Sequence, residues 1–154
     1  MPAESRFVYV TYIRTTPAKL WQALRDPEFT RQYWVQTWQE CEWKKGATWK
    51  LMLPDGRVGD AGQVLEIEPE RRLVLSWRNE FIPEMRDEGY SRMTYEIEPQ
   101  GDMVKFTVIH EIDRPDSKLI DAVAHGWPLN ISSLKTLLET GESLEATRHW
   151  PEGM

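Results

Sequence analysis

The feature that most constrains this chain is a run of short alternating segments followed by a single long helical pattern. Between residues 46 and 112, segments in which apolar and polar residues alternate are separated by turns, at a spacing typical of neighbouring antiparallel strands. Pro54-Asp55-Gly56 favours a hairpin turn, because proline presets φ and glycine accepts a positive φ. Gln100-Gly101-Asp102 joins the last two segments. We therefore predict a continuous antiparallel meander over Gly46–Ile112.

Helical signals lie on both sides of this meander. Residues 6–15 are rich in β-branched and aromatic side chains, which predicts a first strand ahead of it. Thr16-Pro17 then supplies an N-cap and a first helical residue, and Asp26-Pro27 supplies the same signal for a second short helix. From residue 117 to residue 140, apolar residues recur at helical spacing, which predicts one long helix with a continuous apolar face.

Together these elements predict an α+β fold of the helix-grip kind. An antiparallel sheet of six or seven strands has one face to bury, and the C-terminal helix is the predicted element large enough to cover it. Pro128 lies inside that helix and should kink or split it near Gly126. We expect residues 1–144 to form a single domain, with a loose tail over residues 145–154 in which Trp150 has no assigned place.

Charge and cysteine content exclude several classes of protein. The formal net charge of −6 argues against nucleic acid or an anionic membrane surface as the main partner. The single cysteine, Cys41, cannot form an internal disulfide or build a thiolate metal site alone, which favours a cytoplasmic protein. The first residues lack a signal-peptide pattern, and no apolar run approaches the roughly 18 residues that a membrane-spanning helix needs.

The residues give no motif for catalysis, metal binding or cofactor binding. The three histidines and Cys41 lack metal-ligand spacing, and neither a nucleophile elbow nor a phosphate-binding glycine loop is present. We therefore assign no catalytic residue, no metal and no cofactor, and Cys41 is expected to act as a small hydrophobe. Four acidic residues follow the predicted strand over residues 73–79, and they indicate either a solvated loop or a polar lid: Glu80, Glu84, Asp87 and Glu88.

Three segments of the chain resemble one family. They are Thr16–Glu28, Gly62–Trp77 and Gly126–Gly141. In this order they resemble the bacterial single-domain relatives of the C-terminal domain of the Hsp90 ATPase activator, within the START-like superfamily. That superfamily includes lipid-transfer, polyketide-cyclase and pollen-allergen proteins. The resemblance covers about residues 6–144 and implies a hollow between the concave face of the sheet and the last helix.

The chain contains eight tryptophans, an unusual number for its length. Aromatic side chains on apolar faces usually belong to the core, but together they also suit an apolar pocket lined by aromatic rings. We expect the cavity to contact at least three of Trp49, Trp77, Tyr95, His110 and Trp127. With rim residues and helix neighbours added, the candidate ligand-binding set is Trp34, Trp38, Trp49, Leu51, Trp77, Tyr95, His110, Trp127 and Ile131.

His110 has two interpretations, and the function has three. The histidine is either a hydrogen-bonded core residue or a polar anchor that could also donate a proton. The first functional hypothesis is binding of a small hydrophobic or aromatic molecule, lipid- or polyketide-like, without chemistry. The second is a cyclase- or hydratase-type enzyme in which His110 or a carboxylate moves a proton. The third, by analogy with the family, is a protein that contacts an Hsp90-type chaperone. A homodimer is a further possibility.

Overall fold

The chain folds as a seven-stranded sheet around one long helix. The computed structural model describes residues 4–151. In chain order the elements are β1 (Ser5–Ile13), α1 (Pro17–Arg25), α2 (Pro27–Tyr33), β2 (Trp38–Glu40), β3 (Thr48–Met52), β4 (Val58–Glu68), β5 (Arg72–Asn79), α3 (Pro83–Arg86), β6 (Ser91–Gln100), β7 (Met103–Ile112), α4 (Lys118–Thr140) and the short 3-10 helix η1 (Glu145–Thr147).

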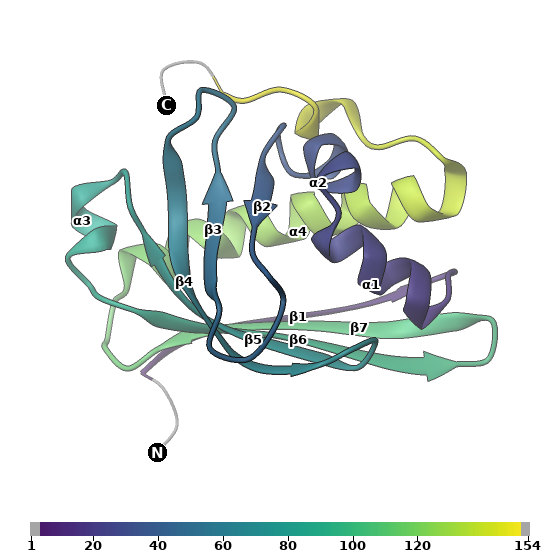
Figure 1. The fold of residues 1–154 in the computed structure, drawn as a ribbon, viewed down its shortest axis with the longest axis horizontal. Helices are drawn as coiled ribbons and strands as arrows, with labels where there is room; N and C mark the ends of the chain where they lie inside the picture. Colours follow the sequence, from purple (N-terminus) through teal and green to yellow (C-terminus); the bar gives the residue numbers. More distant parts are fainter. Residues whose placement is uncertain (1–3, 152–154) are drawn as a thin grey trace.

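The sheet has the predicted meander topology. Its strand order is β1-β7-β6-β5-β4-β3-β2, and every pair is antiparallel. The first strand, β1, pairs with the last strand, β7, so β1 and β2 are the two edge strands of the sheet. In Figure 1, β2 to β4 rise from the layer made by the other strands, so that the curved sheet partly surrounds α4. The predicted helix-grip fold is therefore confirmed.

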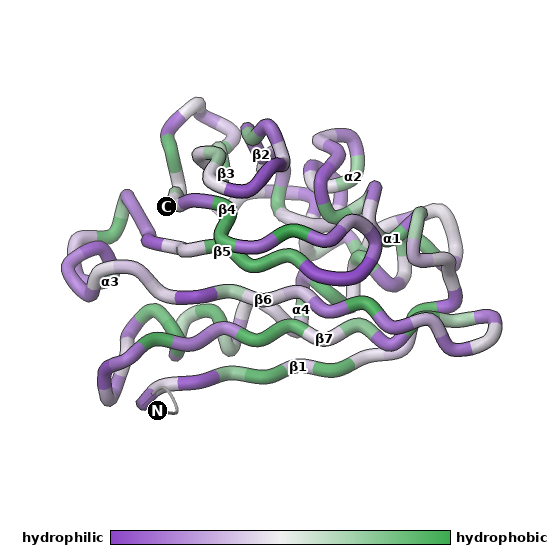
Figure 2. Tube along the Cα trace, turned by 60° about the horizontal axis from the view of Figure 1, so that its bottom comes forward, coloured by the Kyte–Doolittle hydropathy of each residue, from purple (hydrophilic) through white to green (hydrophobic). Residues whose placement is uncertain are grey.

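Alternation along the strands decides which face is buried. Figure 2 shows hydrophobic and hydrophilic residues alternating along the central strands. The pattern is regular in β7, where every second side chain is buried against α4 and the short helices. This regularity fixes the strand register, because a shift by one residue would exchange the two faces. The buried residues of β7 are Val104, Phe106, Val108, His110 and Ile112.

Strand β4 is longer than its sequence pattern indicated. The alternating segment of the sequence starts at Gly62, whereas the strand begins at Val58. Gly59 weakens the strand pattern in the added part, and Gly62 stands at its end. Gly62 is needed there because a Cβ atom on it would lie 1.8 Å from the carbonyl oxygen of Ser76 on β5. The close approach brings Asp60 into the sheet beside Asn79.

Helix α4 runs unbroken through Pro128, so of the two predicted outcomes near Gly126, a kink or a split, the split is wrong. Proline removes one backbone donor and crowds the preceding turn. The residues beside it, however, are held against the sheet, since Trp127 and Ile131 are both buried. Packing of this apolar face outweighs the loss of one hydrogen bond. No helix within residues 4–151 is both long enough and apolar enough to cross a lipid bilayer.

The acidic segment after β5 is attached to the start of α4. The Glu88 carboxylate accepts hydrogen bonds from the Ser117 hydroxyl at 2.6 Å and from the Lys118 backbone amide at 2.7 Å. A carboxylate at a helix N-terminus satisfies amides that have no partner within the helix. Glu80 is also engaged, in a two-point contact with Arg78 at 2.6 and 2.9 Å. This segment is thus a fixed wall next to α4 and not merely a solvated loop.

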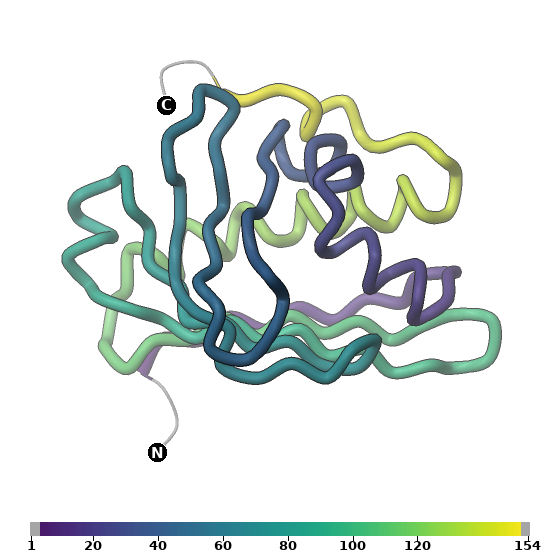
Figure 3. Tube along the Cα trace, in the orientation of Figure 1, coloured from purple at the N-terminus to yellow at the C-terminus, as the bar shows by residue number. Residues whose placement is uncertain are grey.

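The segment after residue 144 is packed, which corrects the expectation of a loose tail. Figure 3 shows it running from the end of α4 back past α2 towards the tips of β3 and β4. Thr147 is buried, and its hydroxyl lies 2.6 Å from that of Ser133 on α4. The Thr147 carbonyl accepts from the Val35 amide at 2.8 Å. These polar contacts have no apolar periodicity, so the sequence pattern did not reveal them. Residues 152–154 lie outside the described part of the chain.

Two glycine variants test this packing. Gly62→Ala should lower the free energy of unfolding by about 1–3 kcal/mol or more, because the new methyl group meets backbone and cannot be accommodated by a side-chain movement. Gly126→Ala should raise it by about 0.5–1 kcal/mol, because the position is helical and nothing lies within 4 Å of an added Cβ. Urea denaturation measures both. Equal effects of the two substitutions would contradict the described β4–β5 contact.

Candidate functional site

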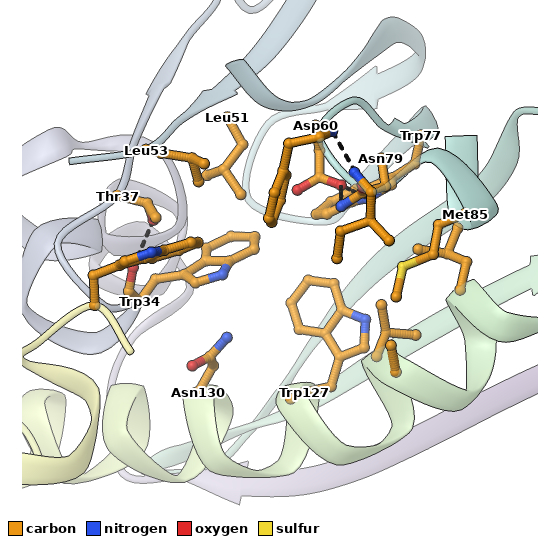
Figure 4. A pocket seen from close by; sticks show the side chains of 17 residues that line it. Trp34, Thr37, Leu51, Leu53, Asp60, Trp77, Asn79, Met85, Trp127 and Asn130 are labelled. Carbon is orange, nitrogen blue, oxygen red and sulfur yellow. Dashed lines mark hydrogen bonds between the residues drawn. The ribbon is translucent and has the colours of Figure 1, made fainter. Parts of the chain in front are cut away.

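A cavity of about 200 Å³ lies where the raised strands, α3, α4 and the C-terminal segment meet. Its wall is mostly apolar and aromatic (Figure 4). α2 contributes its C-cap residue Trp34, and β5 and α4 contribute Trp77 and Trp127. Met85 of α3 and Trp150 of the C-terminal segment complete the wall. The volume is below the roughly 300–1,000 Å³ of a site for a drug-sized molecule, so the cavity suits a small ligand.

The cavity contacts some of the predicted residues and not others. Four of the nine candidates line it, namely Trp34, Leu51, Trp77 and Trp127. Five do not, namely Trp38, Trp49, Tyr95, His110 and Ile131. The expectation that at least three of the five large rings would contact the cavity is wrong, because only two of them do.

The other candidates lie behind the wall or away from it. Trp49 is fully buried 4.5 Å from Trp77, between ring centroids, and its indole N–H donates to Gln39 at 2.8 Å. Tyr95 and Ile131 are packed into the core, and the centroid of the Tyr95 ring lies 5.9 Å from that of Trp127. Trp38 is on the edge strand β2, where the Arg31 guanidinium lies 5.1 Å from its ring. Strand alternation identified the correct face but not the depth of each residue along it.

Three indole rings form the centre of the wall. The centroid of Trp34 lies 6.0 Å from that of Trp77 and 5.3 Å from that of Trp127, and Trp77 and Trp127 are 5.7 Å apart. They come from three separate elements, so each ring supports the position of the other two. Aromatic pairs at these distances add about 0.5–1.5 kcal/mol each beyond the area they bury. The cavity wall is consequently rigid and preformed.

His110 is part of a series of hydrogen bonds that crosses the core from Trp127 to Trp77. The Trp127 indole N–H donates to His110 Nδ1 at 3.1 Å. Because Nδ1 accepts, a neutral ring carries its proton on Nε2, which lies 2.8 Å from the Ser91 hydroxyl. That hydroxyl donates to the Trp77 carbonyl oxygen at 2.9 Å. Every polar atom in this series has a partner.

This environment supports the first interpretation of His110, a hydrogen-bonded core histidine. Burial lowers the pKa of His110 from 6.5 to about 3, so the ring stays neutral over the physiological range. The ring does not reach the cavity, and both of its nitrogens are engaged. It therefore has no free nitrogen with which to orient a ligand in this cavity or to transfer a proton there.

Asp60 is the ionisable residue among those that line the cavity, and the sequence analysis did not identify it. Its Oδ1 accepts from the Trp77 indole N–H at 2.9 Å and from the Asn79 amide at 3.3 Å. Its side chain is almost fully buried, with 8% of the residue exposed. Burial raises the pKa of Asp60 from 3.8 to about 7, against the lowering effect of these two hydrogen bonds; the neighbouring Glu80 carboxylate raises it further. Near neutral pH this group is thus divided between its two protonation states.

The other group with possible chemistry, the Cys41 thiol, does not line this cavity. Within residues 4–151 no three His, Cys, Asp or Glu side chains lie together as a metal site. Cys41 is half-buried, and its sulfur accepts from the Trp43 amide at 3.3 Å. Burial raises the pKa of the Cys41 thiol, which makes the reactive thiolate scarcer. Asp60 is consequently the group in this cavity that could take part in proton transfer.

Two residues of the cavity wall that the sequence analysis did not identify, Asp60 and Trp150, have weak sequence signals. Asp60 stands between Gly59 and Gly62, in a part of β4 that does not look like a strand. Trp150 lies in a segment without periodicity, yet it packs 6.1 Å from Phe81 at the cavity wall, between ring centroids. A tryptophan in a nominal tail was itself a signal, because burying so large a ring requires packing against the folded domain.

The tautomer and charge of His110 can be measured directly. Nitrogen-15 NMR of the imidazole should show a protonated Nε2 and an unprotonated Nδ1, with shifts that stay constant from about pH 5 to about pH 8, because burial holds the pKa near 3. His125 and His149 serve as internal comparisons in the same spectra. A titration of His110 with a midpoint near 6.5 would contradict the buried series of hydrogen bonds.

Asp60 makes the stability of the protein depend on pH. Its pKa is raised in the folded state, so between about pH 4 and pH 7 the folded protein holds a proton that the unfolded chain releases, and stability falls as pH rises. Asp60→Asn removes this loss. We compare the free energy of unfolding of the variant with that of the original protein. From pH 4 to pH 8 this difference should shift in favour of the variant by about 3 kcal/mol. Urea denaturation across this pH range measures it.

His110 contributes equally to the pH dependence of stability in the variant and in the original protein. The difference between their two pH profiles therefore reports on Asp60. Glu84→Gln, which removes an exposed carboxylate from the neighbouring α3, is the matched control and should give a pH profile parallel to that of the original. If the pH profile of Asp60→Asn is also parallel to that of the original protein, burial does not raise the pKa of Asp60.

Solved structures with this arrangement of elements come from several bacteria. A protein MLL2253 from Mesorhizobium loti has a TM-score of 0.74 and 23% identity, over 87% of this chain and 96% of that one. The Aha1 dimer from Colwellia psychrerythraea gives 0.72 and 16%, over 90% and 98%. DynU16, described as a putative protein in the dynemicin biosynthetic locus, gives 0.72 and 18%, over 97% and 51%. At these identities the likeness shows the fold alone.

The sequence itself decides the family. Among curated protein sequences no significant relative is found. The family model described as "Activator of Hsp90 ATPase homolog 1-like protein", however, matches residues 14–139. This match runs from the end of β1 to the last turn of α4, which is most of the chain and includes most of the cavity wall. The chain therefore belongs to the family of Activator of Hsp90 ATPase homolog 1-like proteins.

Proposed function

We propose that this protein binds a small apolar or aromatic molecule in the cavity between the sheet and α4. The observation that carries the proposal is the composition of the wall, in which Trp34, Trp77 and Trp127 line the same cavity as a single carboxyl group, that of Asp60 (Figure 4). Ligand sites are typically apolar and aromatic, with few polar groups that orient the ligand. The cavity of about 200 Å³ accommodates a small ring compound better than a long lipid chain.

The way the wall is built supports a binding role over simple core packing. Two of its rings are held by hydrogen bonds, from Trp77 to Asp60 within the wall and from Trp127 to His110 behind it. A wall fixed in this way does not collapse to fill the space when the cavity is empty. A preformed site loses less conformational entropy when a ligand binds, which favours affinity.

A second candidate function is proton-transfer catalysis, and Asp60 is the observation that favours it. A buried carboxyl with a pKa of about 7 can act as acid or base at neutral pH, as a cyclase- or hydratase-type reaction requires. DynU16 is a relative of this fold from a biosynthetic locus, which agrees with such a role. In this case Asp60 would replace His110 as the group that moves the proton.

The chaperone and homodimer hypotheses depend on relatives. The family description names an Hsp90 ATPase activator, and the Colwellia structure is described as a dimer. Both statements concern those proteins. The contacts of this chain that were described above concern its own core and cavity, and none of them selects a protein partner.

A cavity-filling variant tests the binding function. Thermal-shift measurements against small aromatic alcohols, amines and acids should identify compounds that stabilise the protein, by about 2.7 kcal/mol at a hundredfold excess over Kd. Gly126 lines the cavity, and an added Cβ there meets nothing within 4 Å. Gly126→Leu should therefore place its side chain in the cavity, keep the fold and abolish the shift.

His125→Leu is the matched control, because it adds the same side chain to the same helix at an exposed position. It should keep the ligand-induced shift. The binding proposal fails if no compound stabilises the original protein, or if the Gly126→Leu variant responds as strongly as the His125→Leu control.

A further inference from the structure

Half of the Asp60 carboxyl lacks a partner, and that half faces the cavity. Oδ1 accepts both hydrogen bonds that reach this side chain, from Trp77 and from Asn79. No described residue donates to Oδ2, and Figure 4 shows the carboxyl directed towards the open space. The residue is only 8% exposed, but Oδ2 itself is not completely shielded, so a donor can reach it from the cavity. A carboxylate oxygen with so little hydration is stabilised by a donor that enters the cavity.

No cation of the described chain compensates Asp60, because the nearby ones are paired with other carboxylates. Among residues 4–151, the residues that line the cavity include no Lys, Arg or His. Arg57, whose guanidinium lies 5.3 Å from the Phe81 ring at the wall, is paired with Asp55 at 2.7 Å. Arg78 is held by Glu80. The charge that Asp60 contributes to the cavity is thus negative and uncompensated when the group is ionised.

The aromatic wall also favours a positively charged occupant. The faces of indole rings attract cations within about 6 Å of their centroids, and tryptophan does so most strongly of the aromatic residues. Trp34, Trp77 and Trp127 all line the same small cavity as Asp60. Figure 4 shows Trp34 and Trp127 on two sides of the space, with Asp60 across from them. A carboxylate combined with several indole faces is suited to an ammonium group.

We infer that the cavity binds a small primary ammonium compound with an apolar or aromatic body, whose ammonium group donates to Asp60 Oδ2 beside the indole rings of Trp34 and Trp127. The inference rests on the proposed binding function and narrows it to one class of ligand. The volume of about 200 Å³ limits the body to roughly one ring. An anionic ligand is disfavoured, since it would meet Asp60 with no cation to offset the repulsion.

Proton and ligand compete for the same oxygen. In the empty cavity burial raises the pKa of Asp60 to about 7, so a proton neutralises the group in much of the population at neutral pH. The groups that face it are the neutral Trp77 and Asn79, together with the Glu80 carboxylate, which is paired with Arg78. An ammonium ligand needs ionised Asp60. Its affinity should therefore rise about tenfold between pH 6 and pH 8, and level off above that.

Three probes with the same ring and different head groups test the inference. Benzylammonium, benzyl alcohol and benzoate are positive, neutral and negative between pH 6 and pH 8. Isothermal titration calorimetry of the full chain at pH 8 should rank them in that order, with benzylammonium at least about tenfold tighter than benzyl alcohol. Calorimetry in two buffers of different ionisation enthalpy should also show proton release when benzylammonium binds at pH 6.

Two variants locate the effect. Asp60→Asn keeps the shape of the side chain and should remove both the preference for benzylammonium and its pH dependence, while benzyl alcohol still binds. Glu84→Gln removes a carboxylate from the neighbouring α3, outside the cavity, and should change neither. The pH dependence of the original protein provides the same test without a variant, in case Asp60→Asn fails to fold.

The outcomes separate this inference from the binding function. If benzyl alcohol or benzoate binds as tightly as benzylammonium, or if Asp60→Asn keeps the preference, the ammonium inference is overturned and the binding function stands. If no probe binds while other small aromatic compounds still stabilise the protein, the inference alone is again overturned. If neither the probes nor those compounds bind, both proposals fail together.

Discussion

The architecture depends on one hydrogen bond through the core, from the indole of Trp127 on α4 to the imidazole of His110 on β7. It ties the long helix to the middle of the sheet, and the Ser91 hydroxyl continues the connection to the backbone at Trp77. Large rings occupy this contact, and beside it α4 and the raised strands β3 and β4 do not meet directly. The space left beside the contact is the cavity, with Trp34 as its third large ring.

Burial shifts the pKa of two ionisable residues near this contact, His110 and Asp60, with different consequences. Both His110 and Asp60 are shifted towards their neutral forms, because desolvation penalises charge. The histidine has a partner for each nitrogen, so its neutrality is a stable structural state. Asp60 has partners for one oxygen only, so its neutrality depends on a proton that a ligand can replace. This asymmetry makes the first residue structural and the second a candidate for function.

Sequence patterns predicted the fold well, because alternation and turn chemistry act locally. The meander, the N-terminal strand, the two short helices and the long helix all follow from period-two and helical patterns with their caps. Depth along a strand is set by tertiary packing, which is why Trp77 on β5 lines the cavity and Trp49, two strands away on β3, does not. Asp60 was missed because glycines obscure the start of β4, and Trp150 because its segment is held by polar contacts.

The central claim is that the Asp60 carboxyl faces an apolar cavity without a compensating charge. Carbon-13 NMR of the Asp60 side-chain carboxyl, followed through a pH titration of the ligand-free protein, measures this most directly. The structure predicts a midpoint of about 7, well above the ordinary 3.8. A midpoint near 3.8 would mean that the group is solvated or already paired, and the cavity would then lack the single unsatisfied charge on which its proposed ligand depends.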